Sequence, residues 1–159
     1  MALRVAVLSI LVFLAALGTH EVAHLAVIYA VGGQGSIIVR PWRLGLVDYS
    51  IYALHAQPVQ QLDLGRQALV NFLGPSLAAL PLIALLAAIR EPVARLALIA
   101  NVAILAFYTV IETADLLLEQ RAGVDLSVLT TPEFNYGVPF LIIVFAASFA
   151  PRRARRRTD

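Results

Sequence analysis

The sequence predicts an all-α membrane protein of about four transmembrane helices, with a small β-hairpin or sheet in the first loop. Three observations support this fold class. The 159 residues are 60% hydrophobic and only 14% charged, whereas soluble domains carry about 25% charged residues. The apolar residues gather in runs close to the roughly 20 residues that a helix needs to cross a bilayer. Between the first two runs lies a stretch rich in glycine, β-branched and aromatic residues.

The apolar runs define the expected spans. They cover residues 5–31, 67–89, 93–118 and 136–150, and the fourth is short for a span. Arg4 followed by an apolar run is also typical of a signal peptide. However, the first run continues far beyond its polar residues, so we expect it to be a retained span. Residues 1–150 are predicted to form one domain, and residues 151–159 a basic tail.

The first loop is predicted to contain two strands. Glycines at 32, 33 and 35 are expected to end the first helix, because glycine readily adopts positive φ. Segments 36–40 and 47–54 are rich in β-branched and aromatic residues and suggest short strands around a turn at 41–45. Such a hairpin is either an ordinary surface feature or an edge on which an extended peptide could pair.

The charges bear on topology and on metal chemistry. The chain has no cysteine, so any metal must be held by nitrogen and oxygen ligands. All twelve basic residues are arginine. A basic tail directly after a span marks the cytoplasmic side more often than it marks nucleic-acid binding, so no nucleic-acid partner is expected. With four spans, eight arginines lie inside and four outside, which places the first loop outside.

The first span carries His20, Glu21 and His24 within its apolar run. Histidines four residues apart lie on one helix face, about one turn from each other. Two imidazoles in this arrangement can bind one zinc ion, and the intervening glutamate can accept a proton from a zinc-activated water. Ionisable groups at membrane depth are costly and usually mark a function. The alternative is a polar patch that binds neighbouring helices.

A catalytic zinc site needs a third protein ligand and an open position for water. The third span offers Glu112 and Asp115, which are three residues apart and lie on neighbouring faces of a helix. Either carboxylate could be the ligand, or one of them could pair with Arg121 or cap the helix end. We expect His55, in the loop, to be solvated rather than a ligand.

The depths of these polar residues agree with one another. His20 and His24 lie nearer the end of the first span, and Asp115 lies near the end of the third. The second span runs in the opposite direction, and its polar residue Asn71 lies near its beginning. All of these positions therefore fall toward the membrane face that carries the first loop.

The second span contains Asn71-Phe72-Leu73-Gly74-Pro75. Glycine and proline in a membrane helix permit a kink or a close approach of a neighbouring helix. Asn71 could donate a hydrogen bond to a substrate peptide or to a developing oxyanion. The alternative is a helix-packing site.

This succession of motifs resembles the site-2 protease family of intramembrane metalloproteases. His20-Glu21-Val22-Ala23-His24 lies in one span, Asn71-x-x-Gly74-Pro75 in the next, and an acidic residue in the following one. The resemblance covers residues 5–118, including the loop with Gly32-Gly33 and its strand-like segments. It implies zinc bound by His20, His24 and an aspartate, here Asp115, with Glu21 as general base. In the family a glycine often follows that aspartate; here Leu116 follows, so Glu112 remains the alternative.

The resemblance implies an intramembrane zinc metalloprotease that hydrolyses peptide bonds of membrane-embedded substrates. Its expected surroundings are the bilayer, as a multi-pass protein of the cell membrane, and a membrane-protein or membrane-peptide substrate. The family's active site generally faces the cytosol, whereas the arginine count places the motif side outside. Two other functions stay open. One is an inactive membrane protein on the same scaffold that binds zinc or partner helices, and the other is a structural or transport subunit whose histidines relay protons.

Overall fold

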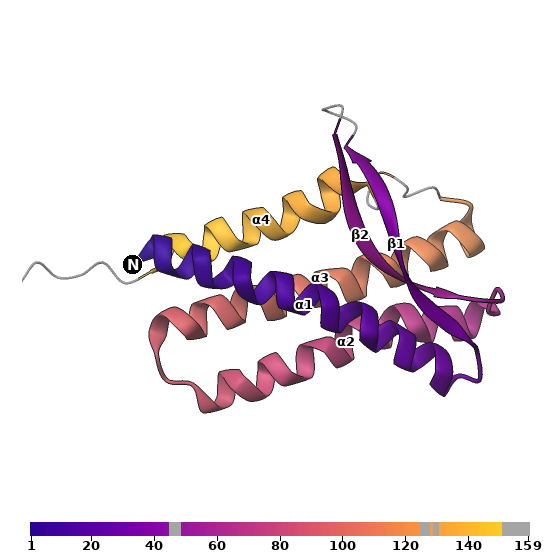
Figure 1. The fold of residues 1–159 in the computed structure, drawn as a ribbon, viewed down its shortest axis with the longest axis horizontal. Helices are drawn as coiled ribbons and strands as arrows, with labels where there is room; N and C mark the ends of the chain where they lie inside the picture. The colour runs from indigo at the N-terminus through magenta and orange to yellow at the C-terminus, as the bar shows by residue number, and fades with distance from the viewer. Residues whose placement is uncertain (45–48, 125–127, 129–130, 151–159) are drawn as a thin grey trace, which may run out of the picture.

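The computed structural model describes residues 1–44, 49–124, 128 and 131–150. The described chain is mostly helical with one small antiparallel sheet, which confirms the predicted combination of long helices and a hairpin (Figure 1). Its elements are α1 (Ala2–Ala30), β1 (Gly35–Leu44), β2 (Tyr49–Pro58), α2 (Leu64–Ala88), α3 (Pro92–Ala122) and α4 (Pro132–Ser148).

Local sequence signals set the helix ends. The Asp63 side chain caps α2 by accepting a hydrogen bond from the Arg66 N–H at 3.0 Å. Glu91 caps α3 in the same way, from the Ala94 N–H at 2.6 Å, and a proline follows at the first helical position. Gly123 ends α3 with a left-handed φ of 62°, a conformation that glycine adopts without strain.

The hairpin is longer than the sequence suggested. Its strands have ten residues each, and the antiparallel register pairs Ile37 with Ala56 and Pro41 with Tyr52. The turn predicted at 41–45 is therefore wrong, because β1 continues through Pro41 to Leu44. In a two-stranded sheet both strands are edges, so a proline without an N–H can be accommodated there. The connection between the strands lies outside the described residues.

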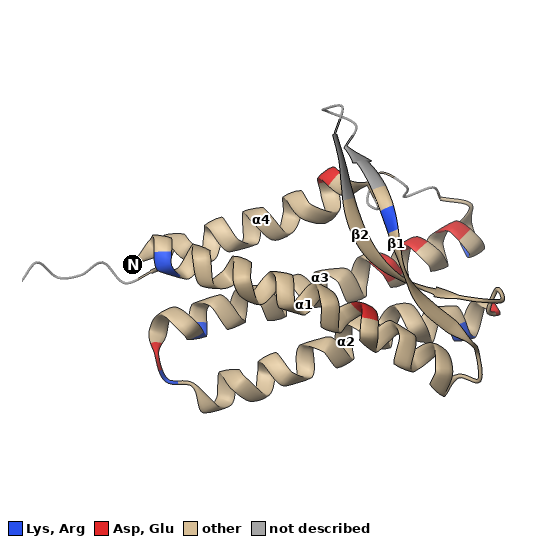
Figure 2. Ribbon diagram, viewed as in Figure 1, with Lys and Arg blue, Asp and Glu red and all other residues tan. Residues whose placement is uncertain are grey.

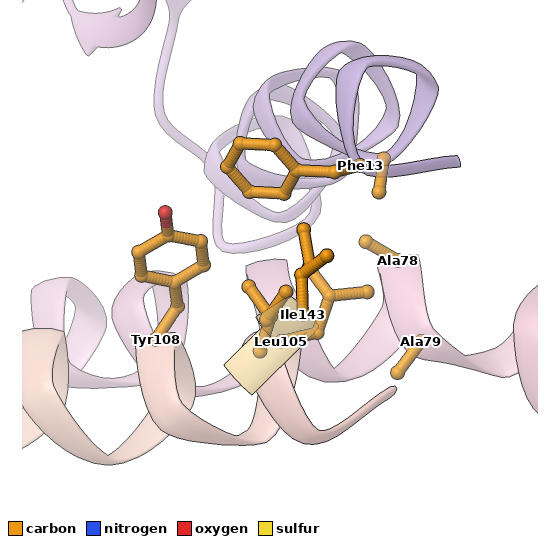
Figure 3. Packing of buried hydrophobic residues seen from close by; sticks show 8 residues of the cluster. Phe13, Ala78, Ala79, Leu105, Tyr108 and Ile143 are labelled. Atoms are coloured by element: carbon orange, nitrogen blue, oxygen red, sulfur yellow. The ribbon is translucent and has the colours of Figure 1, made fainter. Parts of the chain in front are cut away.

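The four helices form a bundle in which α1 and α3 run in one direction and α2 and α4 in the other (Figure 1). At one end Val5 packs with Val93 and Ala147, which joins the start of α1, the start of α3 and the end of α4. A central cluster containing Phe13, Leu105 and Ile143 fills the middle (Figure 3). At the other end a further cluster joins α1, β2 and α2, and it consists of Val27, Ile28, Ala56 and Val70.

Three helices, α1, α2 and α3, are long and apolar enough to cross a membrane. The fourth, α4, is apolar but has only 17 residues, or about 25 Å against a hydrocarbon core of about 30 Å. Charged residues lie mainly toward the two ends of the bundle (Figure 2). Large apolar side chains are instead exposed along its length, among them Leu11 and Leu14 at 59% each and Leu141 at 65%.

Candidate metal centre

Two imidazoles lie together on the inner face of α1. His20 and His24 are 5% and 8% exposed. Their ring centroids are 4.5 Å apart, and the two Nε2 atoms approach to 2.8 Å. The four-residue spacing on a helix therefore produces the convergence that the sequence predicted, with both Nε2 atoms directed at one point.

Glu112 of α3 supplies a carboxylate to the same point. Its Oε1 lies 3.3 Å from His20 Nε2, and its Oε2 lies 3.1 Å from His24 Nε2. The three ligand atoms all lie within 4.8 Å of one another. Among the described residues, His20, His24 and Glu112 are the group of metal-ligating side chains that could hold one ion.

The sequence favoured Asp115 as the third ligand, whereas the structure groups Glu112 with the two histidines. Glu112 continues the stripe of α3 that holds the buried Tyr108, one turn earlier. A residue three positions further along is rotated by about 60° around the helix axis relative to Glu112. Asp115 consequently lines the adjacent cavity but is not part of the group with the two histidines.

The donor set fits a divalent metal. Ligands of a tetrahedral zinc ion at 2.0–2.1 Å lie about 3.3 Å from one another. The carboxylate–imidazole separations, 3.3 Å to Oε1 and 3.1 Å to Oε2, are close to this value, but each imidazole approaches a different oxygen of Glu112. The two Nε2 atoms, 2.8 Å apart, would need to separate by about half an ångström. Two imidazoles and one carboxylate also match the three-ligand sets of catalytic zinc sites, which keep a fourth position for water.

Glu21 is held by the hairpin. Its Oε2 accepts a hydrogen bond of 2.6 Å from the backbone N–H of Ala56 in β2, while its Oε1 lies 3.8 Å from His20 Nδ1. The Ala56 N–H is thus directed away from β1, toward the free edge of β2. No side-chain pattern predicts this contact, because the donor is a backbone group of an alanine.

Asn71 connects α2 to the turn of α3 that carries Glu112. Its Nδ2 donates to the backbone carbonyl of Glu112 at 2.9 Å, and its Oδ1 accepts from Gln67 Nε2 at 2.8 Å. A side-chain amide has two N–H groups, so one remains beyond the bond to Glu112. Gln67 was not singled out from the sequence, although its spacing of four residues from Asn71 is the spacing at which helical side chains meet.

Tyr108 supports the first imidazole. Its ring stacks on the His20 ring at 5.5 Å with an interplanar angle of 7°. Its hydroxyl donates to the Asn135 carbonyl of α4 at 2.7 Å, so the shorter helix is tied to the ligand through one side chain. Figure 3 shows Tyr108 at the edge of the central apolar cluster.

A cavity of about 800 Å³ adjoins the three ligands. Its lining includes Glu21, Asn71, Asp115 and His55, together with residues of both strands and of α4. His55 is exposed, as expected, but it lies on β2 rather than in a loop. The ligand group is therefore open to a cavity at the hairpin end of the bundle.

The fold and the site together define a helical bundle with three apolar helices, a convergent His–His–Glu group and an adjoining cavity. No protein-family model matches this chain, and no curated protein or solved structure matches it either. The functional proposal therefore rests on the chemistry of the site and on the motif order along the chain.

Proposed function

We propose that this chain is a multi-pass integral membrane protein of the cell membrane, in which α1, α2 and α3 cross the bilayer. The support is the length and apolarity of these helices, the exposed apolar side chains along them and the charges toward the two ends. On this arrangement the ligand group lies within the bundle, nearer the end that carries the hairpin.

We further propose that the protein is an intramembrane zinc metalloprotease. The observation that carries this proposal is the convergence of His20, His24 and Glu112, within 4.8 Å of one another, beside a cavity that Glu21 lines. A zinc ion held there would polarise a water molecule and lower its pKa from 15.7 toward about 7.

The chain's own residues then supply the proton transfers. Glu21 lies on the same helical turn as the ligands and acts as general base, taking the proton of the attacking water and delivering it to the leaving amine. Asn71 has an amide N–H beyond the one bonded to Glu112 and donates it to the oxyanion that develops on the peptide carbonyl. Both side chains line the cavity from their positions on α1 and α2.

The substrate is a membrane-embedded protein or peptide segment. A helical segment hides its peptide carbonyls in its own hydrogen bonds, so it must unwind locally before attack. An extended segment has unpaired backbone groups, which the outer edge of β2 can satisfy by strand pairing once the bond from the Ala56 N–H to Glu21 is released. This edge runs along the same cavity as Glu21.

Substitution of Glu21 by Gln tests the function. The purified protein in lipid nanodiscs is incubated with a fluorescent transmembrane peptide, and zinc content is measured in parallel. Glu21→Gln is expected to lower cleavage by about 10²- to 10⁴-fold, with zinc content unchanged. The matched control is Glu91→Gln at the start of α3, at the end of the bundle remote from the hairpin. The glutamine amide oxygen can still cap that helix. Cleavage by Glu21→Gln at the control rate would remove Glu21 from catalysis.

A second candidate is an inactive protein on the same scaffold that binds zinc or partner helices. The bond between Glu21 and the Ala56 N–H favours it, because this carboxylate is already engaged by the hairpin. Stoichiometric zinc, without cleavage of membrane peptides by the unmodified chain, would establish it. The proton-relay alternative predicts no bound zinc and a pH-dependent ion flux.

A further inference from the structure

The imidazole of His24 rests directly against the backbone of α2 at Gly74. A Cβ atom added to Gly74 would lie 2.3 Å from His24 Nδ1, 2.5 Å from Cε1 and 2.6 Å from Cγ. Side-chain carbons do not approach other atoms this closely, so an imidazole in this position requires a residue without a Cβ. Backbone conformation does not explain the glycine, since Gly74 lies inside a helix and has no positive φ.

The close approach brings the ring to a hydrogen-bond acceptor. The backbone of Val70, one helical turn before Gly74, lies within hydrogen-bonding reach of the His24 ring. Its Nε2 lies on the other side, facing His20 and Glu112, so Nδ1 is the nitrogen that faces α2. A carbonyl oxygen has two lone pairs, and Val70 can therefore accept from Nδ1–H as well as from the helix.

This contact decides which nitrogen carries the proton. A neutral imidazole has one N–H and one lone pair. With the proton on Nδ1, the lone pair of Nε2 points at the ligand group. Metal-binding histidines commonly donate their second nitrogen to a carbonyl or carboxylate, and this bond fixes both tautomer and ring orientation.

We propose that Gly74 is a positioning residue: it admits the His24 ring to the α2 backbone, where the Val70 carbonyl holds a proton on Nδ1, while Nε2 faces His20 and Glu112, the direction in which it would bind a metal. The metal half of this inference rests on the proposed function, but the tautomer of His24 does not. The other helical glycines differ, since a Cβ on Gly18 or Gly137 would meet nothing within 4 Å, and one on Gly65 would meet only the Asp63 side chain at 3.4 Å.

The tautomer is measured in metal-free protein by ¹⁵N NMR of the imidazoles. The chain has three histidines, so His55→Asn and His20→Asn variants suffice to assign the signals. We expect His24 to be protonated on Nδ1 in the unmodified chain and to populate both tautomers in Gly74→Ala. Gly18→Ala, a matched substitution in α1, is expected to match the unmodified chain. A His24 ring with no proton on Nδ1 in the unmodified chain would overturn the proposal, and this measurement requires no variant to fold.

Metal titration supplies the second readout. Zn²⁺ and Co²⁺ affinities are expected to fall by about 10- to 100-fold in Gly74→Ala, as for other losses of an outer-shell partner, and the visible absorption bands of bound Co²⁺ are expected to shift. Gly18→Ala should retain both. Equal affinity and identical bands in Gly74→Ala would contradict a positioning role. If the unmodified chain binds neither metal, the proposed function fails, whereas the tautomer result still decides the role of Gly74.

Discussion

Two polar layers join α1 to α3, and they differ in what surrounds them. Ser9 meets Asn101 in one layer, and His20 meets Glu112 in the other. The layers are eleven residues apart on both helices, or about 16 Å along the bundle. In the first layer Asn101 Nδ2 donates to the Ser9 carbonyl at 3.1 Å and to the Ala97 carbonyl at 2.8 Å, and both polar side chains are fully buried. The second layer opens onto the cavity.

Burial of polar groups does not by itself identify a chemical site. The Ser9–Asn101 layer consists of neutral groups, in which Asn101 Nδ2 donates to the backbone of both helices while Ser9 Oγ and Asn101 Oδ1 have no hydrogen-bond partner among the described residues. Side-chain bonds of this kind between helices contribute to helix association in membranes. The His20–Glu112 layer combines ionisable groups, converging ligand atoms, access from the cavity and a hairpin strand that contacts Glu21. The convergence of ligand atoms and their access to the cavity, rather than polarity, distinguish the His20–Glu112 layer from the Ser9–Asn101 layer.

The largest expected difference between the layers is in metal affinity. Removing a ligand in His24→Ala should weaken zinc binding by more than about 100-fold, the upper end for outer-shell losses. Asn101→Ala should leave zinc affinity within about twofold, because the first layer is about 16 Å away. Zinc titration with a competing chelator measures both. Equal losses in the two variants would mean that the layers share one structural role.

The two carboxylates of α3, Glu112 and Asp115, are expected to differ in their effect on zinc affinity. Glu112→Ala should lower zinc affinity by about 100-fold or more, while Asp115→Ala should change it by only a few-fold, because Asp115 lies outside the convergent group. Zinc content after dialysis, determined by mass spectrometry, separates them. A larger loss in Asp115→Ala would restore the ligand that the sequence favoured.

The smallest expected effects concern the two asparagines. Asn71→Leu removes the bonds to Glu112 and Gln67 and should weaken zinc binding by about tenfold. Asn101→Leu should leave zinc binding unchanged. Each substitution should lower the free energy of unfolding by about 1 kcal/mol, since hydrogen bonds between membrane helices average about 0.6 kcal/mol. Denaturant titration in detergent measures stability, and an unchanged zinc affinity in Asn71→Leu would show that the bond from Asn71 does not position Glu112.

The sequence predicted the long helices to within a few residues because their signals are local. Apolar runs set their lengths, and caps such as Asp63, Glu91 and Gly123 set their ends. The hairpin was predicted from its β-branched and aromatic residues, although its turn was placed too early because Pro41 suggested a break. A proline at a sheet edge does not interrupt pairing, and the composition of the segment does not reveal that the strand lies at an edge.

The site was predicted in part, for a different reason. His20 and His24 share a face through the helix period alone. The choice between Glu112 and Asp115 depends on how α3 is rotated about its axis against α1, and this rotation is a property of the whole bundle. The contact of Glu21 with Ala56 and that of His24 with Val70 and Gly74 involve backbone groups. Backbone groups are the same at every position, so residue identities do not identify Ala56 or Val70 as partners; Gly74 indicated that a helix could approach closely, but not which side chain would do so.

The late arrival of Glu112 has a consequence for biosynthesis. His20 and His24 are synthesised with α1, whereas Glu112 is synthesised only later, with α3. A nascent chain that has not yet inserted its third helix lacks the complete ligand set. Under the proposed function, the enzyme is therefore inert while it passes through the insertion machinery, surrounded by other unfinished membrane segments, and it becomes competent only when the bundle closes.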